Sequence, residues 1–187
     1  MLIDPFHDYS LFLGGKGSGK TTLMQMFASK VSKSNIYLLN TSREKSWEKY
    51  VNKENIYYPN LLTLKEFNKL ILQMVSDAKS KSLLIFDDVD AFPNLRKSDV
   101  FYSIISQSRH MDIGVMVSSR LLNAFPIGFY TQADRAFFAS QKSRYVVQYI
   151  ATYVGLENAY SLIGMPQYTF GVWDNLTREM QKMKLSK

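Results

Sequence analysis

The sequence contains no cysteine and only two histidines among its 187 residues. The first absence excludes disulfide bonds, thiolate metal sites and thiol catalysis, and together the two argue against a transition-metal centre. No apolar run approaches the roughly 18 residues that suggest a membrane-spanning helix. The first residues, Met-Leu-Ile-Asp-Pro, lack a basic region followed by an apolar stretch, so no signal peptide is expected. We therefore expect a cytoplasmic protein without a membrane partner.

Charge and hydrophobic content narrow the class of protein further. Hydrophobic residues make up 46% of the chain, which is enough to bury a core and excludes an intrinsically disordered protein. We expect one domain across residues 1–187. Lys and Arg outnumber Asp and Glu by 23 to 16, which gives a formal net charge of +7. This excess suits a polyanionic partner, but many basic proteins bind only a nucleotide, so charge alone does not decide for nucleic acid.

A glycine-rich stretch at residues 14–21 matches the pattern G-x-x-x-x-G-K-[ST] of phosphate-binding loops, also called Walker A. A polyphosphate needs many backbone donors close together, and glycines allow both the unusual dihedral angles and the close approach. Lys20 is expected to reach the β- and γ-phosphates of ATP, and the Thr21 hydroxyl to bind Mg²⁺. The residues predicted to bind the nucleotide are Gly14, Gly15, Lys16, Gly17, Ser18, Gly19, Lys20, Thr21 and Thr22. The alternative is a glycine turn that binds nothing.

Two adjacent carboxylates follow an apolar run at residues 83–86. Continuous apolar residues are typical of a strand in a parallel sheet that is covered on both faces, and the carboxyl end of such a strand opens onto the ligand crevice. Asp87 and Asp88 are therefore expected beside the phosphate-binding loop, as a Walker B motif. Asp87 is predicted to hold Mg²⁺ and Asp88 to orient or activate the attacking water. Asp90 replaces one of them only if the register is shifted, and solvated loop acids are the alternative.

Predicted strands and helices alternate along the chain. Apolar and β-branched stretches predict strands at residues 9–13, 36–40, 55–58, 83–88, 113–118, 133–139 and 168–173. Periodic apolar residues predict helices at 20–31, 64–78, 98–108 and 143–154, with a short one at 44–51. Residues 175–187 form a basic tail, expected to be helical or frayed. The alternation implies a three-layer α/β fold of the P-loop NTPase type with a mostly parallel central sheet.

ATP hydrolysis also needs a cation that stabilises the transition state. Arg109, Arg120 and Arg135 lie near the ends of predicted strands. Each is a candidate arginine finger for the site of a neighbouring subunit, with Arg109 the first choice, or else a surface residue. The basic pair Arg96 and Lys97, after the carboxylates, and the lysines of the tail are the clearest basic clusters for binding DNA, although a solvated surface explains them equally well.

With these residues placed, the chain resembles the FtsK–HerA superfamily of DNA-pumping ATPases, above all the branch that packages genomes into double-jelly-roll virus capsids. The matching pieces occur in the family's order and cover roughly residues 8–140. They are the loop 14–21, the strand and acids 83–88, the stretch Ser-Arg-His-x-x-Ile-Gly at 108–114, Pro126 and the strand near Arg135.

Two positions depart from the family's pattern. Asp88 occupies the place of a glutamate, and residues 118–120, Ser-Ser-Arg, occupy the place of a sensor glutamine that detects the γ-phosphate. Ser119 is still able to hydrogen-bond phosphate or water, and Arg120 to sense charge directly. Both residues are therefore kept as candidate catalytic residues beside Lys20 and Asp88.

The resemblance implies an ATPase that couples hydrolysis to the movement of double-stranded DNA, as a viral genome-packaging motor. It further implies a homo-oligomeric ring, hexameric or pentameric, with DNA in its channel, active sites between subunits and a capsid protein as a possible partner. Such a protein would work in the cytoplasm of the host cell or on the virion. Two other interpretations stay open: a P-loop kinase of small molecules such as nucleotides, and a slowly hydrolysing, nucleotide-dependent assembly switch.

Overall fold

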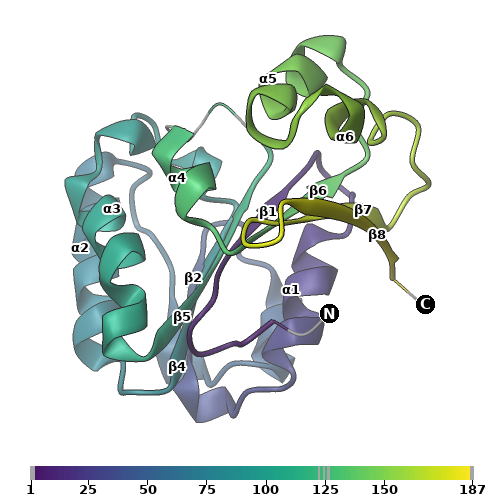
Figure 1. The fold of residues 1–187 in the computed structure, drawn as a ribbon. Helices are drawn as coiled ribbons and strands as arrows, with labels where there is room; N and C mark the ends of the chain where they lie inside the picture. Colours follow the sequence, from purple (N-terminus) through teal and green to yellow (C-terminus); the bar gives the residue numbers. More distant parts are fainter. Residues whose placement is uncertain (1–2, 122, 124, 126, 186–187) are drawn as a thin grey trace.

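A computed structural model describes residues 3–185 except 122, 124 and 126. These residues form a central eight-stranded sheet with helices on both faces (Figure 1). Pro126, which the family resemblance included, lies outside the described residues. The predicted three-layer α/β fold is confirmed.

The sheet is mostly parallel, as predicted. Its strands follow the order β3-β2-β4-β5-β1-β6-β7-β8. The strands from β3 to β6 in this order are parallel to one another, and β7 and β8 add antiparallel pairs at one side. The bounds are β1 (Tyr9–Leu13), β2 (Ile36–Asn40), β3 (Ile56–Tyr57), β4 (Ser82–Asp87), β5 (Ile113–Ser119), β6 (Arg135–Ala139), β7 (Thr169–Asp174) and β8 (Glu179–Lys184).

The helices are divided between the two faces of the sheet (Figure 1). Helix α1 covers one face, and α2, α3 and α4 cover the other. The helices are α1 (Lys20–Ala28), α2 (Leu64–Asp77), α3 (Asp99–Gln107), α4 (Ile127–Gln132), α5 (Arg144–Val154) and α6 (Leu156–Tyr160). Short 3₁₀ turns include η2 (Lys45–Lys49), η4 (Val89–Ala91), η5 (Leu95–Lys97) and η6 (Ser108–Met111).

Two hydrophobic cores lie on opposite faces of the sheet, and β1 contributes to both. Leu11 and Leu13 belong to the core beneath α2 and α3, whereas Phe12 packs with α1 in the other. Side chains alternate between the two faces of a strand, so a strand covered on both sides is largely apolar, and in β1 the polar residue Ser10 is buried as well. All five residues of β1 are buried. This burial explains the unbroken apolar run that precedes the glycine-rich loop.

The prediction that the basic tail is helical or frayed is wrong. Residues 179–184 form strand β8, which pairs with β7. The two apolar residues of β8, Met180 and Met183, are three positions apart, which is a helical spacing. In the strand they face opposite sides of the sheet, and each packs against a different core. A strand that contributes one residue to each face lacks the period-two pattern by which strands are recognised.

Two further local differences concern turns and short helices. The short helix expected at 44–51 is the 3₁₀ turn η2, with Glu44 rather than Ser42 accepting the capping hydrogen bond. Helices α4 and α6 were not predicted; with six and five residues, they are too short to show a clear period.

Candidate nucleotide-binding site

The sheet topology brings the glycine-rich loop and the two acids to one edge. The loop follows β1, and Asp87 ends β4. Strand β5 lies between these two strands, and all three run in the same direction. Their carboxyl ends therefore meet in one crevice, which is the usual ligand site of an open parallel sheet.

Glycine is required in the loop at positions where the backbone is tightly packed. At Gly19 the backbone has φ 95°, and an added Cβ would lie 2.7 Å from the ring of Tyr168. At Gly14 an added Cβ would lie 2.5 Å from the Cβ of Ala139. Gly19 also precedes α1 without a side-chain cap. The N–H groups of the first turn are therefore available to an anion, which the helix dipole attracts.

Lys20 is buried, with 5% of its surface exposed. Its Nζ donates hydrogen bonds to the carbonyl oxygens of Gly14 and Gly15 at 2.9 and 3.4 Å. Burial lowers the pKa of Lys20, while the neighbouring Asp88 and Asp87 oppose this effect. The ammonium group is therefore held directly beneath the loop that would carry phosphates.

Asp87 is only 1% exposed, and three side chains donate to its carboxylate. Ser118 Oγ donates to Oδ1 at 2.6 Å, and Trp47 Nε1 donates to Oδ2 at 2.9 Å. Thr21 Oγ1 lies 3.5 and 3.4 Å from the two oxygens. Thr21 and Asp87, the two residues predicted to hold Mg²⁺, thus face each other.

The chemistry of this pair fits a magnesium ion bound together with a nucleotide. The described residues contain no cluster of three or more His, Cys, Asp or Glu side chains that would hold a metal alone. Mg²⁺ usually keeps several waters and takes one or two protein oxygens beside phosphate oxygens. A hydroxyl and a carboxylate, Thr21 and Asp87, are such a set.

Asp88 lies next to Lys20, with 3.8 Å between Asp88 Oδ1 and Lys20 Nζ. Its backbone is left-handed, with φ 51°, and its N–H donates to Ser118 Oγ at 2.8 Å. Oδ1 is buried and has no hydrogen-bond partner in the part of the chain that the structure describes. Burial raises the pKa of Asp88, and the charge of Asp87 adds to this effect. A carboxylate of raised basicity with an unused oxygen suits the orientation of water.

The two candidate sensor residues have partners of their own. Ser119 Oγ donates to the carbonyl of Leu121 at 2.9 Å, so this hydroxyl closes a turn. Arg120 pairs with the buried Asp90, its N–H and Nε donating at 2.8 and 3.1 Å. Asp90, expected to act only with a shifted register, therefore serves here as the counter-ion of Arg120.

A cavity of about 660 Å³ lies beside the glycine-rich loop. It is lined by Lys16 and Ser18 from the loop and by Arg120. The segment 140–143, after β6, and the segment 165–169, which leads into β7, complete the lining. Gln167 Nε2 donates to the carbonyl of Gly17 at 3.2 Å and so attaches the second segment to the loop. Since β6 and β4 lie on opposite sides of β1, the cavity is on the side of the loop away from the two acids.

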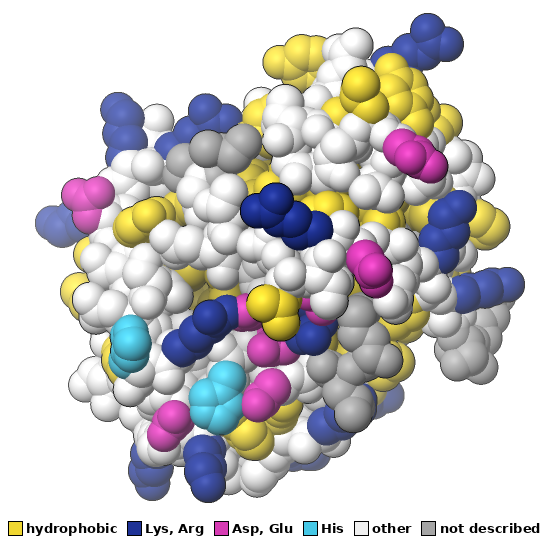
Figure 2. Space-filling view, viewed as in Figure 1, with side chains coloured by type: hydrophobic (Ala, Val, Ile, Leu, Met, Phe, Trp, Pro, Cys, Tyr) yellow, Lys and Arg dark blue, Asp and Glu magenta, His cyan; other side chains and the backbone are white. Residues whose placement is uncertain are grey.

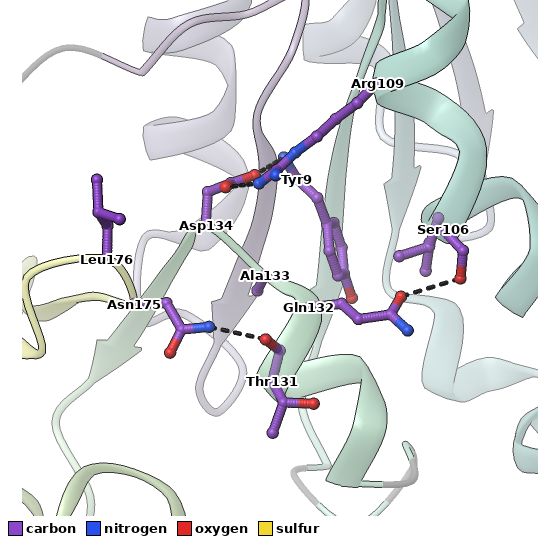
Figure 3. Close-up of a pocket in the computed structure, with 10 residues that line it drawn as sticks. Tyr9, Ser106, Arg109, Thr131, Gln132, Ala133, Asp134, Asn175 and Leu176 are labelled. Atoms are coloured by element: carbon purple, nitrogen blue, oxygen red, sulfur yellow. Dashed lines mark hydrogen bonds and ion pairs between the residues drawn. The ribbon is translucent and has the colours of Figure 1, made fainter.

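Arg109 lies far from this site, at the amino ends of the parallel strands, which form the opposite edge of the sheet. It belongs to η6, which precedes β5, and it forms an ion pair with Asp134 (Figure 3). Asp134 Oδ2 also accepts from the backbone N–H of Tyr9 at 2.8 Å. These residues line a second cavity, of about 440 Å³. Arg135 is at the same edge, paired with Asp8 and Asp174.

The candidate DNA-binding residues Arg96 and Lys97 are exposed in η5, beyond β4. Arg96 donates to the carbonyl of Asn123. Figure 2 shows that, on the face seen there, Lys and Arg side chains are scattered among acidic ones rather than gathered in one patch. The basic character of the chain is thus not concentrated on that face.

The sequence analysis assigned no role to three residues of the site: Thr41, Trp47 and Ser118. Thr41 Oγ1 donates to the carbonyls of Asp87 and Asp88 at 2.6 and 3.2 Å. Ser118 could have been found, because it lies one residue before the end of β5, the strand between the loop and the acids. No motif marks Thr41 or Trp47.

A phosphate-binding loop and a carboxylate pair at one edge of a parallel sheet define a P-loop nucleotide-binding domain. The sequence model of the AAA family, "ATPase family associated with various cellular activities", matches residues 10–124. The chain belongs to this family.

Solved structures with the same fold include proteins that package DNA. The genome packaging NTPase B204 from Sulfolobus turreted icosahedral virus 2, in complex with AMPPCP, has a TM-score of 0.81 and 17% identity, over 97% of this chain and 99% of that one. The DNA-packaging ATPase B204 from Sulfolobus turreted icosahedral virus has a TM-score of 0.79 and 19% identity, over 99% and 100%. The pCW3 conjugation coupling protein TcpA, with ATPγS, has 0.68 and 10%, over 97% and 61%.

At these identities the likeness concerns the fold, and the resemblance predicted from the sequence is confirmed at that level. No curated protein matches the chain in sequence. No helix among the described residues is long and apolar enough to cross a membrane.

Replacing aspartate by asparagine is expected to change the melting temperature in opposite directions at Asp88 and at Asp90. Asp88→Asn is expected to raise the melting temperature of the nucleotide-free protein at pH 8. Burial raises the pKa of Asp88 in the folded chain above its pKa in the unfolded chain. Stability is therefore lost as the pH rises from the unfolded-state pKa to the folded-state pKa, and asparagine removes this loss. Asparagine also tolerates the left-handed backbone.

Asp90→Asn is the matched control and is expected to lower the melting temperature, because it removes the charge that pairs with Arg120. Thermal unfolding followed by circular dichroism measures both. A fall in melting temperature for Asp88→Asn would contradict the description of Asp88 as an under-satisfied carboxylate.

Proposed function

We propose that this protein is an ATPase that moves double-stranded DNA and serves as a viral genome-packaging motor. The observation that carries the proposal is the meeting of Lys20, Asp88 and the pair Thr21–Asp87 at one sheet edge. The fold shared with B204, a genome packaging NTPase, over 97% of this chain supports the choice of packaging.

In the proposed reaction the phosphates of ATP bind to the N–H groups of the glycine-rich loop. Lys20, which now donates to the carbonyls of Gly14 and Gly15, would donate to the β- and γ-phosphates when ATP is bound. Mg²⁺, held by Thr21 and Asp87, supplies charge neutralisation when bound. Asp88 uses its unpaired oxygen to accept a hydrogen bond from the attacking water and orients it toward the γ-phosphate.

The rest of the nucleotide is expected on the other side of the loop. The acids fix the terminal phosphates on the β4 side, so the ribose and base extend toward the β6 side. The cavity of about 660 Å³ there is large enough for a small ligand, in the range of typical ligand pockets. Lys16 and Ser18 line this cavity from the side of the loop.

A ring explains the position of Arg109. A residue at the edge opposite its own phosphate-binding loop cannot reach that loop, but a head-to-tail interface brings this edge against the loop of a neighbour. Such heterologous interfaces generate rings when the rotation between subunits closes. Arg109 is more than half exposed, and its ion pair with Asp134 keeps it at the edge. We propose that it completes the site of the adjacent subunit.

The DNA partner is proposed from charge and from the packaging neighbours. A net charge of +7 favours a polyanion, and Arg96 and Lys97 are exposed on a loop that follows the acids, which suits contacts to a phosphate backbone. A capsid protein is a further partner that the packaging role would require. We expect the motor to act in the host cytoplasm or at the virion.

Steady-state ATP hydrolysis with and without double-stranded DNA tests this proposal. We expect DNA to raise turnover, and the stimulation to fall steeply with salt because phosphate contacts release counterions. Lys20→Ala should lower turnover by about 100-fold or more, because it removes a cation from the transferred phosphate.

Turnover that ignores DNA at low salt would contradict the motor and favour the assembly switch. Transfer of phosphate to a nucleoside monophosphate would instead favour the small-molecule kinase.

Mixing two inactive variants tests the role of Arg109 in a neighbour's site. Arg109→Ala alone should lower turnover by roughly 1000-fold, the lower range for an arginine finger. Mixed with Lys20→Ala, it should regain activity, because some interfaces then join an intact loop to an intact Arg109.

Arg144→Ala, at an exposed position at the start of α5, is the control and should stay active. Full activity of Arg109→Ala, or no recovery on mixing, would show that Arg109 does not act in trans.

A further inference from the structure

We infer that Trp47 is a positioning residue that fixes the carboxylate of Asp87 for binding Mg²⁺, and that its fluorescence reports on the occupied site. The inference rests on the proposed function, since it concerns the metal that accompanies ATP. It assigns a task to a side chain from the segment after β2, outside both phosphate-site motifs.

The contact between Trp47 and Asp87 is direct and buried. Trp47 is 0% exposed in η2, and its Nε1 lies 2.9 Å from Asp87 Oδ2. An indole N–H is only a donor, and a carboxylate is only an acceptor when ionised. The hydrogen bond therefore fixes the orientation of the carboxylate at Oδ2.

Trp47 and Ser118 hold the carboxylate from different elements. Trp47 donates to Oδ2, and Ser118, at the end of β5, donates to Oδ1 at 2.6 Å. Each oxygen is thus fixed by one strong hydrogen bond, and rotation of the carboxylate would break both. The acceptor capacity that remains on the two oxygens is available to Thr21, at 3.4 and 3.5 Å.

The segment that carries Trp47 is itself attached to the site. Thr41 donates to the carbonyl of Asp87 at 2.6 Å, and Ser46 accepts from Gln25 of α1 at 2.6 Å. Strand β2 places Asn40 in register with Asp87. The indole is therefore held between α1 and the end of β4.

The test compares the magnesium dependence of two tryptophan-to-phenylalanine variants. Trp47→Phe keeps an aromatic ring in the core but removes the N–H donor. It should raise the Mg²⁺ concentration for half-maximal ATP hydrolysis by about 10-fold or more, as removal of partners of metal ligands does. Binding of ATP in excess EDTA should stay as in the wild type, which a general loss of structure would not allow.

Trp173→Phe is the matched control. Trp173 is the other tryptophan; it lies in β7 and packs in the core on the opposite face of the sheet. Its removal should leave the magnesium dependence unchanged. It also leaves Trp47 as the single emitting indole.

Emission from Trp47 in Trp173→Phe gives a second readout that does not alter Trp47. We expect a non-hydrolysable ATP analogue to change this emission more with Mg²⁺ than with EDTA. The inference is overturned if the emission is the same in both, or if folded Trp47→Phe keeps the wild-type magnesium dependence. A wild-type protein that binds no nucleotide at all would instead overturn the proposed function, and the inference with it.

Discussion

The burial of charge at the carboxyl edge of the sheet is the constraint on which the rest of the site depends. Lys20 and Asp87 are almost fully buried, and a buried charge is stable only when hydrogen bonds and counter-charges replace water. Carbonyls of the glycine-rich loop do so for Lys20, and Ser118, Trp47 and Thr21 do so for Asp87. This requirement accounts for two features of the chain. The segment after β2 brings Trp47 to Asp87, and the end of β5 carries the polar residue Ser118.

The same constraint leaves Asp88 under-satisfied, and Asp88 is the residue to which we assign the attacking water. Asp88 has a buried oxygen without a hydrogen-bond partner among the described residues, and its pKa is raised by burial. An under-satisfied polar site lowers stability but is ready for a substrate, a balance often found at active sites. The proposed role of Arg109 in a neighbour's site would extend the account to assembly.

Much of the fold follows from the sequence because burial on both faces leaves a strong signal. The runs at 9–13 and 83–88 were recognised as strands because burial on both faces makes them largely apolar, with Ser10 and the terminal acids as their polar residues. The contacts of Trp47 and the ion pair of Arg109 with Asp134 could not be predicted, because they join residues that are 40 and 25 positions apart without any shared motif. Strand β8 was missed because Met180 and Met183 serve different cores. The pattern of apolar residues indicates which positions are buried. The contacts of Trp47, the Arg109 ion pair and strand β8 depend instead on which distant segments pack against each other.

The most direct measurement of the central claim is calorimetric binding of a non-hydrolysable ATP analogue, with and without Mg²⁺. The account predicts about one nucleotide per chain, bound more tightly with Mg²⁺ because Thr21 and Asp87 face each other beside the loop. Absence of binding, or binding that is indifferent to Mg²⁺, would contradict the claim that this sheet edge is a magnesium–nucleotide site.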